Sequence, residues 1–146
     1  MNRSLPVLLL ALLPALAQAS LGGKADSVGS DQTQLRSSAF KAQPALGYTI
    51  QTLALPIGTT VREYLNSAGT VFAVSWTGRM PPDLHQLLGV YYPQFYSAAR
   101  AIPGRHPVAV NSAGLVLNAE GHGRLFHGRA WIPDLLPAGV SGADIQ

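Results

Sequence analysis

The chain has 146 residues, 10 lysines and arginines against 7 aspartates and glutamates, and no cysteine. Without cysteine the fold has no disulfide, so its stability must come from a hydrophobic core. The net charge of +3 is small, and the arginines are spread singly, without the basic and aromatic clusters of a nucleic-acid-binding surface. The composition therefore favours one small domain that binds no nucleic acid.

The amino terminus has the three parts of a secretory signal peptide. Arg3 and the terminal amino group form a cationic start, residues 5–16 form an apolar run, and Ala17 and Ala19 are the small residues that signal peptidase recognises. As a helix the run would rise only ~18 Å, too short for a hydrocarbon core of ~30 Å. We expect cleavage near Ala19, removal of residues 1–19, and a soluble mature chain in the periplasm or outside the cell.

Residues 20–45 are mostly small and polar, and they predict a loosely structured or helical lead-in. Within this segment residues 31–36 favour a weak helix, because few apolar positions are available to anchor it. Beyond it the apolar content and the periodicity increase, so residues 46–146 are predicted to form one α+β domain.

Three strands are predicted in the first half of this domain. Residues 48–53 alternate polar and apolar side chains, and residues 60–65 and 70–76 continue with β-branched and aromatic residues. Asn66 opens and Gly69 closes the turn between the second and third strands, where glycine adopts a positive φ at little cost. This pattern is typical of an antiparallel hairpin.

A helical period follows over residues 83–102, with its apolar residues on one stripe that should pack on the sheet. Asp83 is placed as the N-cap, and Gln86 lies three residues later, as in a capping box. Gly89 and Pro93 lie inside the pattern. They predict a kink or a broken second half, because proline removes an amide from the helical ladder.

The last third of the chain returns to short strands at residues 107–110, 115–119 and 124–132, which are separated by glycine-containing turns. The whole pattern predicts a single α+β domain. It consists of a mainly antiparallel sheet of about six strands with one main helix packed on one face, plus a weak amino-terminal helix.

Glu120, His122 and His127 form the densest group of acid–base and metal-binding residue types. Alternation along a strand puts Glu120 and His122 on one face but gives His127 the opposite parity, so His127 would need a bulge or the turn to join them. Metal binding and general acid–base chemistry are both open. The glycines on either side of His122 nevertheless favour a solvated hairpin tip, so we expect no metal and no cofactor.

Two further pairs of residues have both a functional and a structural interpretation. Tyr92 and Tyr96, four apart on the helix, could present a stacking surface for a glycan or a partner, or could pack at the edge of the core. Asp83 and Asp134 each lie in a Pro-Asp-Leu triplet and could form a catalytic carboxylate pair. A helix cap requires the same residue type at both places, and capping is the preferred interpretation.

Six blocks of sequence together resemble one known family. They are residues 19–23 (Ala-Ser-Leu-Gly-Gly), 62–64 (Arg-Glu-Tyr), 69–76 (Gly-Thr-Val-Phe-Ala-Val-Ser-Trp), 82–84 (Pro-Asp-Leu), 87–89 (Leu-Leu-Gly) and 128–137 (Gly-Arg-Ala-Trp-Ile-Pro-Asp-Leu-Leu-Pro). With these blocks the chain resembles an exported proteobacterial family known only as domain of unknown function 2844. The resemblance covers essentially the whole mature chain. It implies a complete one-domain exported protein and brings no activity, cofactor or site residue.

Three functions are compatible with these observations. We favour a non-enzymatic exported protein of the bacterial envelope that binds or assists a partner. The first alternative is a small envelope hydrolase that uses His122 with Glu120, and the second is a carrier of an apolar ligand held between sheet and helix. The residues alone do not identify the partner.

Overall fold

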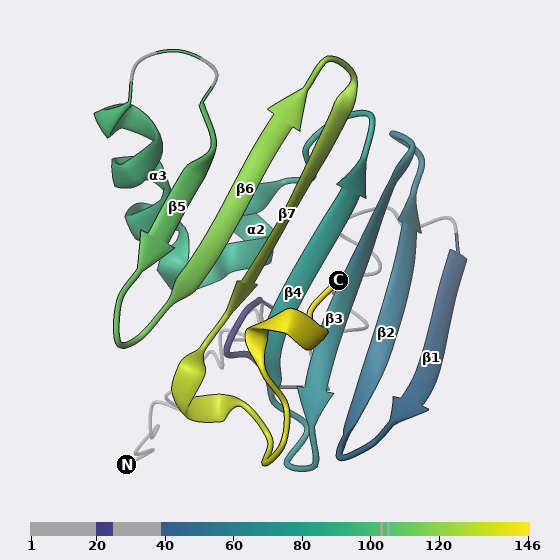
Figure 1. The fold of residues 1–146 in the computed structure, drawn as a ribbon. Coiled ribbons are helices and arrows are strands. Elements are labelled where there is room, and N and C mark those ends of the chain that lie inside the picture. Colours follow the sequence, from purple (N-terminus) through teal and green to yellow (C-terminus); the bar gives the residue numbers. More distant parts are fainter. Residues whose placement is uncertain (1–19, 25–38, 103, 105) are drawn as a thin grey trace, which may run out of the picture.

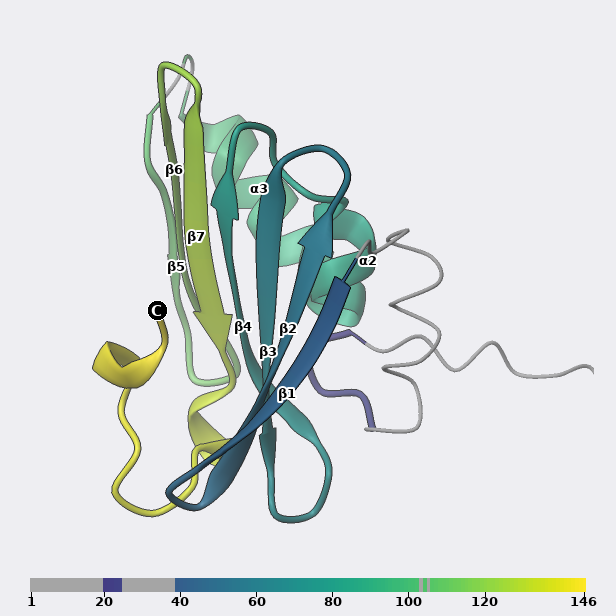
Figure 2. The ribbon, with the colours of Figure 1, turned by 90° about the vertical axis from the view of Figure 1, so that its right-hand side faces the viewer.

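The computed structural model describes residues 20–24, 39–102, 104 and 106–146. The predicted signal peptide and the predicted helix at residues 31–36 lie outside the described residues. The described residues form a seven-stranded sheet, with the main helices on one face and the C-terminal segment on the other (Figures 1 and 2). The predicted class, a mainly antiparallel α+β fold, is confirmed.

Neighbouring strands in this sheet are antiparallel, in the spatial order β1-β2-β3-β4-β7-β6-β5. The strands are β1 (Ala39–Ala45), β2 (Tyr48–Leu55), β3 (Thr59–Asn66), β4 (Val71–Gly78), β5 (Val108–Asn111), β6 (Val116–His122) and β7 (Leu125–Trp131). The first four strands follow one another as a meander. The chain then passes through the helices to the opposite edge and returns inward, so that β7 pairs with β4.

The sheet has seven strands rather than about six, because β1 lies in the segment that we expected to be loosely structured or helical. It pairs with β2 along its whole length, from Ala39 opposite Ala54 to Ala45 opposite Tyr48. Gly47, with φ 81°, provides the tight turn between them. The sequence of β1 has no β-branched residue and contains a proline, so strand propensity could not identify it.

Residues 20–24 are also part of the fold, although they belong to the expected lead-in. The amide of Leu21 donates a hydrogen bond to the carbonyl of Leu87 at 3.1 Å. Val71 accepts from the amide of Gly22 at 2.8 Å and donates to the carbonyl of Gly23 at 2.9 Å. The Leu21 side chain is 1% exposed. This short segment therefore fills part of the core between sheet and helix.

The predicted main helix is broken where Gly89 and Pro93 indicated. It consists of α2 (Leu84–Leu88), the 3-10 turn η2 (Gly89–Tyr91) and α3 (Tyr92–Ala101). Gly89 has φ 52°, and a Cβ there would overlap the side chain of Ser20. The predicted N-cap is confirmed, because Asp83 Oδ1 accepts a hydrogen bond from the amide of Gln86 at 3.1 Å. Among the described residues no helix is long and apolar enough to cross a membrane.

The main hydrophobic core lies between the sheet and the helices. Its larger buried members are Leu21, Leu53, Leu55, Val61, Leu65, Val74, Trp76, Leu87, Leu88, Leu115, Leu117 and Ile132. The alternation of the strands explains this face, since the sheet residues next to these in sequence point to the other side. The helix-side face is therefore closed by apolar packing over most of the sheet.

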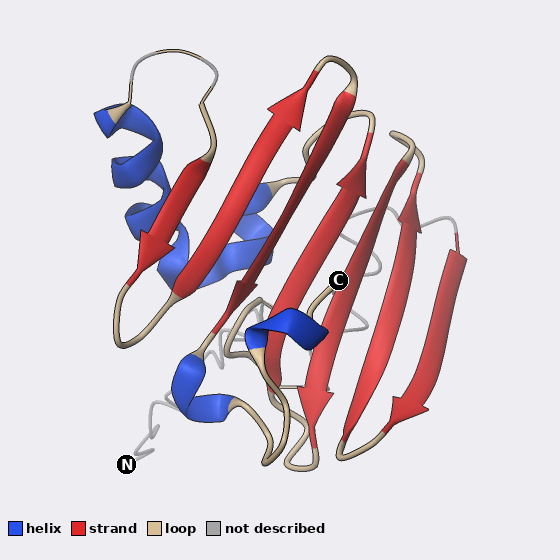
Figure 3. Cartoon of the chain, viewed as in Figure 1, coloured by secondary structure: helices blue, strands red, loops and turns tan. Residues whose placement is uncertain are grey.

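The opposite face is covered in part by the C-terminal segment, with two short 3-10 helices, η3 (Pro133–Leu135) and η4 (Gly142–Asp144) (Figure 3). Here Ile145 packs with Tyr64, Phe72 and Ala73 in a second, smaller core. Where this segment ends, the outward-pointing residues of β4, β6 and β7 remain uncovered, and these residues form the candidate site.

The capping interpretation of Asp134 is wrong. The N-cap of η3 is Ile132, no side chain caps it, and Asp134 lies inside the first turn. Asp83 instead uses its carboxylate to cap α2, so the two Pro-Asp-Leu triplets have different structural roles.

Candidate functional site

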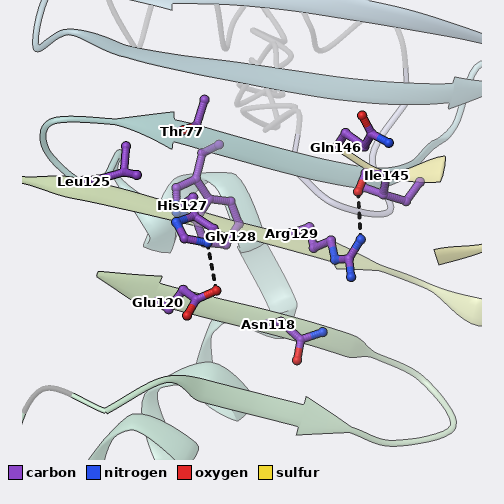
Figure 4. A pocket seen from close by; sticks show the side chains of 10 residues that line it. Thr77, Asn118, Glu120, Leu125, His127, Gly128, Arg129, Ile145 and Gln146 are labelled. Atoms are coloured by element: carbon purple, nitrogen blue, oxygen red, sulfur yellow. Dashed lines mark hydrogen bonds and ion pairs between the residues drawn. The ribbon is translucent and has the colours of Figure 1, made fainter. Parts of the chain in front are cut away.

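A groove of about 730 Å³ lies over strands β4, β7 and β6. It is on the face of the sheet that the C-terminal segment covers in part, which we call the tail side. Its polar lining consists of Thr77, Asn118, Glu120, His127 and Arg129 (Figure 4). Leu125 lies at one end, and the last two residues of the C-terminal segment form the wall at the other. A volume of this size is in the range of sites that hold a small molecule or a short peptide.

The pairing register explains why these polar side chains face the same way. Residues directly opposite one another in an antiparallel pair share a face, and in this sheet Thr77 lies opposite His127, and His127 opposite Glu120. Asn118 lies opposite Arg129 in the same way. Three neighbouring strands thus place their outward residues in two adjacent rows, and these rows form the floor of the groove.

Glu120 and His127 form a hydrogen bond across the β6–β7 hairpin, with 2.8 Å between Glu120 Oε1 and His127 Nε2. The turn is therefore what joins His127 to Glu120, which is one of the two routes that the sequence left open. It resets the alternation, and the register places His127 directly opposite Glu120. Both side chains are about half exposed, at 46% and 54%, so the pair contributes only ~0–1 kcal/mol to stability.

His122 does not join this pair in the groove. It is the last residue of β6, lies opposite Leu125 at the hairpin end, and is not part of the groove lining. Within the part of the chain that the structure describes, no group of three histidine, aspartate or glutamate residues lies close enough to hold a metal ion. Of the three residues singled out in the sequence, the fold brings two together, and they suit hydrogen bonding to a ligand.

Three polar side chains hydrogen-bond to the C-terminal end of the chain, and sequence analysis did not identify them as functional. The main-chain oxygen of Gln146 accepts hydrogen bonds from Arg62 Nη1 at 2.9 Å, the Tyr64 hydroxyl at 2.6 Å and the Ser75 hydroxyl at 2.7 Å. Ser75 interrupts an otherwise apolar strand and is 4% exposed. A buried hydroxyl needs a hydrogen-bond partner, so a serine within a run of apolar residues was the sequence signal for this contact.

Arg129 hydrogen-bonds to the same C-terminal segment and also lines the groove. Its Nη1 donates to the carbonyls of Gly142 and Ile145, both at 3.1 Å, and its guanidinium lies 5.7 Å from the ring centroid of Trp131. The same side chain lines the groove floor. A ligand in the groove would therefore contact a residue that also holds the C-terminal segment.

Tyr92 and Tyr96 lie on α3, on the helix side of the sheet and away from the groove. Their ring centroids are 6.0 Å apart with planes inclined by 32°. His85 packs edge-on against Tyr92 at 5.0 Å, and Arg100 lies 5.5 Å from the Tyr96 ring and donates to its hydroxyl. These neighbours already use the rings, although Tyr96 is 46% exposed. A stacking role for this pair stays a prediction.

A second cavity, of about 380 Å³, lies between the helices and the outer strands. Its lining is mainly apolar and includes Leu84, Phe95, Val108 and Phe126. This is the place where an apolar ligand would have to lie if the protein were a carrier. The cavity is about half the size of the groove, and Glu120 and His127 line both, together with His106 in the cavity.

The fold and the groove define a class: a small α+β protein with an open polar groove on one face of an antiparallel sheet. A family model described as "Protein of unknown function (DUF2844)" matches residues 17–145, so the chain belongs to this family. The resemblance seen in the six sequence blocks is thereby confirmed. No curated protein and no solved structure matches the chain.

Proposed function

We propose that this protein is an exported, non-enzymatic binding module of the bacterial envelope and that it holds its partner in the groove over β4, β7 and β6. The observation that carries this proposal is the set of outward polar side chains that line an open groove of about 730 Å³. Export is supported by the signal-peptide pattern of residues 1–19.

The lining of the groove favours a ligand that has both hydrogen-bond donors and acceptors along its length. Asn118 offers an amide, Thr77 a hydroxyl, Arg129 a guanidinium, and Glu120 with His127 a carboxylate and an imidazole. Such a mixed set suits the alternating N–H and C=O groups of a peptide main chain better than a purely anionic or apolar ligand. We therefore propose a peptide segment of another envelope protein as the partner.

Site-specific photo-cross-linking in cells tests this proposal. Thr77 is exposed on the groove floor, and Asn111 is exposed on edge strand β5, outside the groove. With p-benzoylphenylalanine at each position in turn, we expect an adduct of one defined mass from position 77 and none from position 111. Equal adducts at both positions, or none at position 77 in a folded protein, would contradict the proposal.

A hydrolase is the second candidate, because the hydrogen-bonded pair of Glu120 and His127 lies in the groove. In this version His127 replaces His122 as the partner of Glu120, and the carboxylate would orient the imidazole to activate a water molecule. Turnover of ester or peptide substrates by the wild-type protein, lost by ~10²-fold or more in His127→Gln and unchanged in His122→Gln, would favour the hydrolase over the binding module.

A further inference from the structure

The last two residues of the described chain occupy a pocket on the sheet. Ile145 is fully buried against Tyr64 and Phe72, and the next main-chain oxygen, that of Gln146, accepts three hydrogen bonds. The Gln146 amide also donates to the Tyr64 hydroxyl at 2.9 Å. We call this arrangement the tail seat. It recognises one apolar side chain followed by one main-chain carbonyl, which is a pattern that any peptide can supply.

Besides the tail seat, the segment is held by Arg129, which donates to the carbonyls of Gly142 and Ile145, and by close packing of Gly142 against the Trp131 ring. Within residues 141–146, all of which the structure describes, Ile145 alone is buried, whereas Ser141, Ala143, Asp144 and Gln146 are exposed. The chain leading into the segment passes through Gly139, with φ 79° and no heavy atom within 4 Å of an added Cβ. Because most of its side chains are exposed and it is not paired into the sheet, such a segment opens at a lower free energy than the sheet beneath it.

The tail seat and the groove are continuous. Ile145 and Gln146 form one wall of the groove, and Arg129 lies in the groove floor while donating to the carbonyl of Ile145. If the segment leaves, the floor extends from the groove across β4 to Ser75 and then to Arg62 on β3, since these two residues lie opposite one another. The combined surface would suit a longer peptide than the groove alone.

We propose that the tail seat is a peptide-binding site in which residues 145–146 are a resident ligand, which a partner peptide displaces. The partner peptide carries a branched aliphatic residue followed by a main-chain oxygen, and it continues into the groove. The resident segment competes at an effective concentration on the order of mM, as expected for a short flexible connection. It therefore keeps the site closed until a matching partner is present. This inference extends the proposed function but is tested at the seat alone.

Full-length variants with a released segment test the proposal directly. Ile145→Asp places a charge in the buried pocket, whereas Ala143→Asp places the same charge on the exposed side of the same segment and is the matched control. The probe is a fluorescently labelled peptide with the sequence of residues 141–146, followed by anisotropy. We expect binding to Ile145→Asp at least ~10-fold tighter than to the wild type or to Ala143→Asp.

Two further comparisons show which groups of the peptide the tail seat binds. A probe with aspartate at the isoleucine position should not bind, and Ser75→Ala in the Ile145→Asp background should weaken binding by about 10-fold, because one donor to the peptide oxygen is lost. Probes with a free and with an amidated C-terminus distinguish a terminal carboxylate from an internal carbonyl as the group that the seat accepts.

Several outcomes would overturn the proposal. A folded Ile145→Asp that does not bind the probe, or equal binding by all variants, would show that the seat has no specificity in trans. If Ile145→Asp does not fold, Ile145→Ala replaces it in the same comparison. Failure of both variants to fold would show that the segment is an integral part of the folding unit. Cross-linking at position 77 does not depend on these results, so the proposed function is tested separately.

Discussion

At the scale of single residues, Ser75 shows how a buried polar side chain can indicate a contact with a distant part of the chain. Ser75 lies between Val74 and Trp76, which are both buried and apolar, and its hydroxyl donates to the main-chain oxygen of Gln146. Tyr64 and Arg62 make the same contact from β3. Their partners are more than 70 positions away along the chain, so local pattern could indicate that these residues have a role but not which role.

Two tryptophan rings lie flat against glycines in this fold, and Gly128 allows a sharp test of that packing. A Cβ at Gly128 would overlap the buried ring of Trp76 on the neighbouring strand, whereas a Cβ at Gly114 would meet no heavy atom within 4 Å. We expect Gly128→Ala to lower the free energy of unfolding by about 1–3 kcal/mol through overpacking. Gly114→Ala should be nearly neutral. Urea denaturation of both variants measures the difference, and equal midpoints would contradict the packing.

At the scale of secondary-structure elements, what sequence could predict depends on whether a signal is local. The broken helix was predictable because Gly89 and Pro93 act within one turn of the chain. The edge strand β1 was not, because its pairing with β2 rather than its own residues makes it a strand. The pairing of Glu120 with His127 depends on the hairpin register, which becomes known only when the turn is placed at residues 123–124.

The two Pro-Asp-Leu triplets provide a matched pair for testing helix capping. Asp83 accepts a hydrogen bond from the amide of Gln86, whereas Asp134 lies within η3 and caps nothing. Asp83→Ala should therefore cost about 1 kcal/mol of stability. Asp134→Ala should cost less than ~0.5 kcal/mol, as is usual for an exposed surface substitution. Chemical denaturation of the two variants measures both losses of stability. If Asp134→Ala cost as much as Asp83→Ala, the capping assignment would be wrong.

Docking of the C-terminal segment should depend on pH through Asp144. Its carboxylate accepts hydrogen bonds from the amide of Ser141 at 2.7 Å and from the Ser141 hydroxyl at 2.9 Å, and these bonds lower the pKa of Asp144 in the folded state. A lowered pKa means that the stabilisation is present above the ordinary pKa of the carboxyl and is lost as the pH falls through the folded value.

We therefore expect Asp144→Asn to melt at a slightly lower temperature than the wild type at pH 7. The difference should disappear when the pH falls below the folded pKa of Asp144. Melting curves across this range, with Ala143→Asn as a control on the same segment, provide the measurement. A difference that persists unchanged at low pH would assign the effect to something other than the carboxylate.

At the scale of the whole molecule, the two faces of the sheet differ in how far apolar packing covers them. The helix side is closed by a continuous core that includes Leu21 near the start of the described chain. The tail side has a smaller core under the C-terminal segment and leaves the polar groove open. Stability thus rests mainly on one face, which leaves the other face free to carry exposed polar groups that contribute little to folding.

The proposed export requires that cleavage and folding occur in a definite order. Leu21, two residues beyond the predicted cleavage point at Ala19, is 1% exposed and hydrogen-bonded to Leu87. A peptidase needs an extended, accessible segment, so we expect cleavage to precede the docking of residues 20–24. The intact mass of protein from the envelope fraction should therefore correspond to a chain that begins at Ser20. A Leu21→Asp variant should still be cleaved but should fold poorly, because a charge would replace a fully buried side chain. Protein that keeps residues 5–16, or that leaves the membrane fraction only with detergent, would contradict export by cleavage.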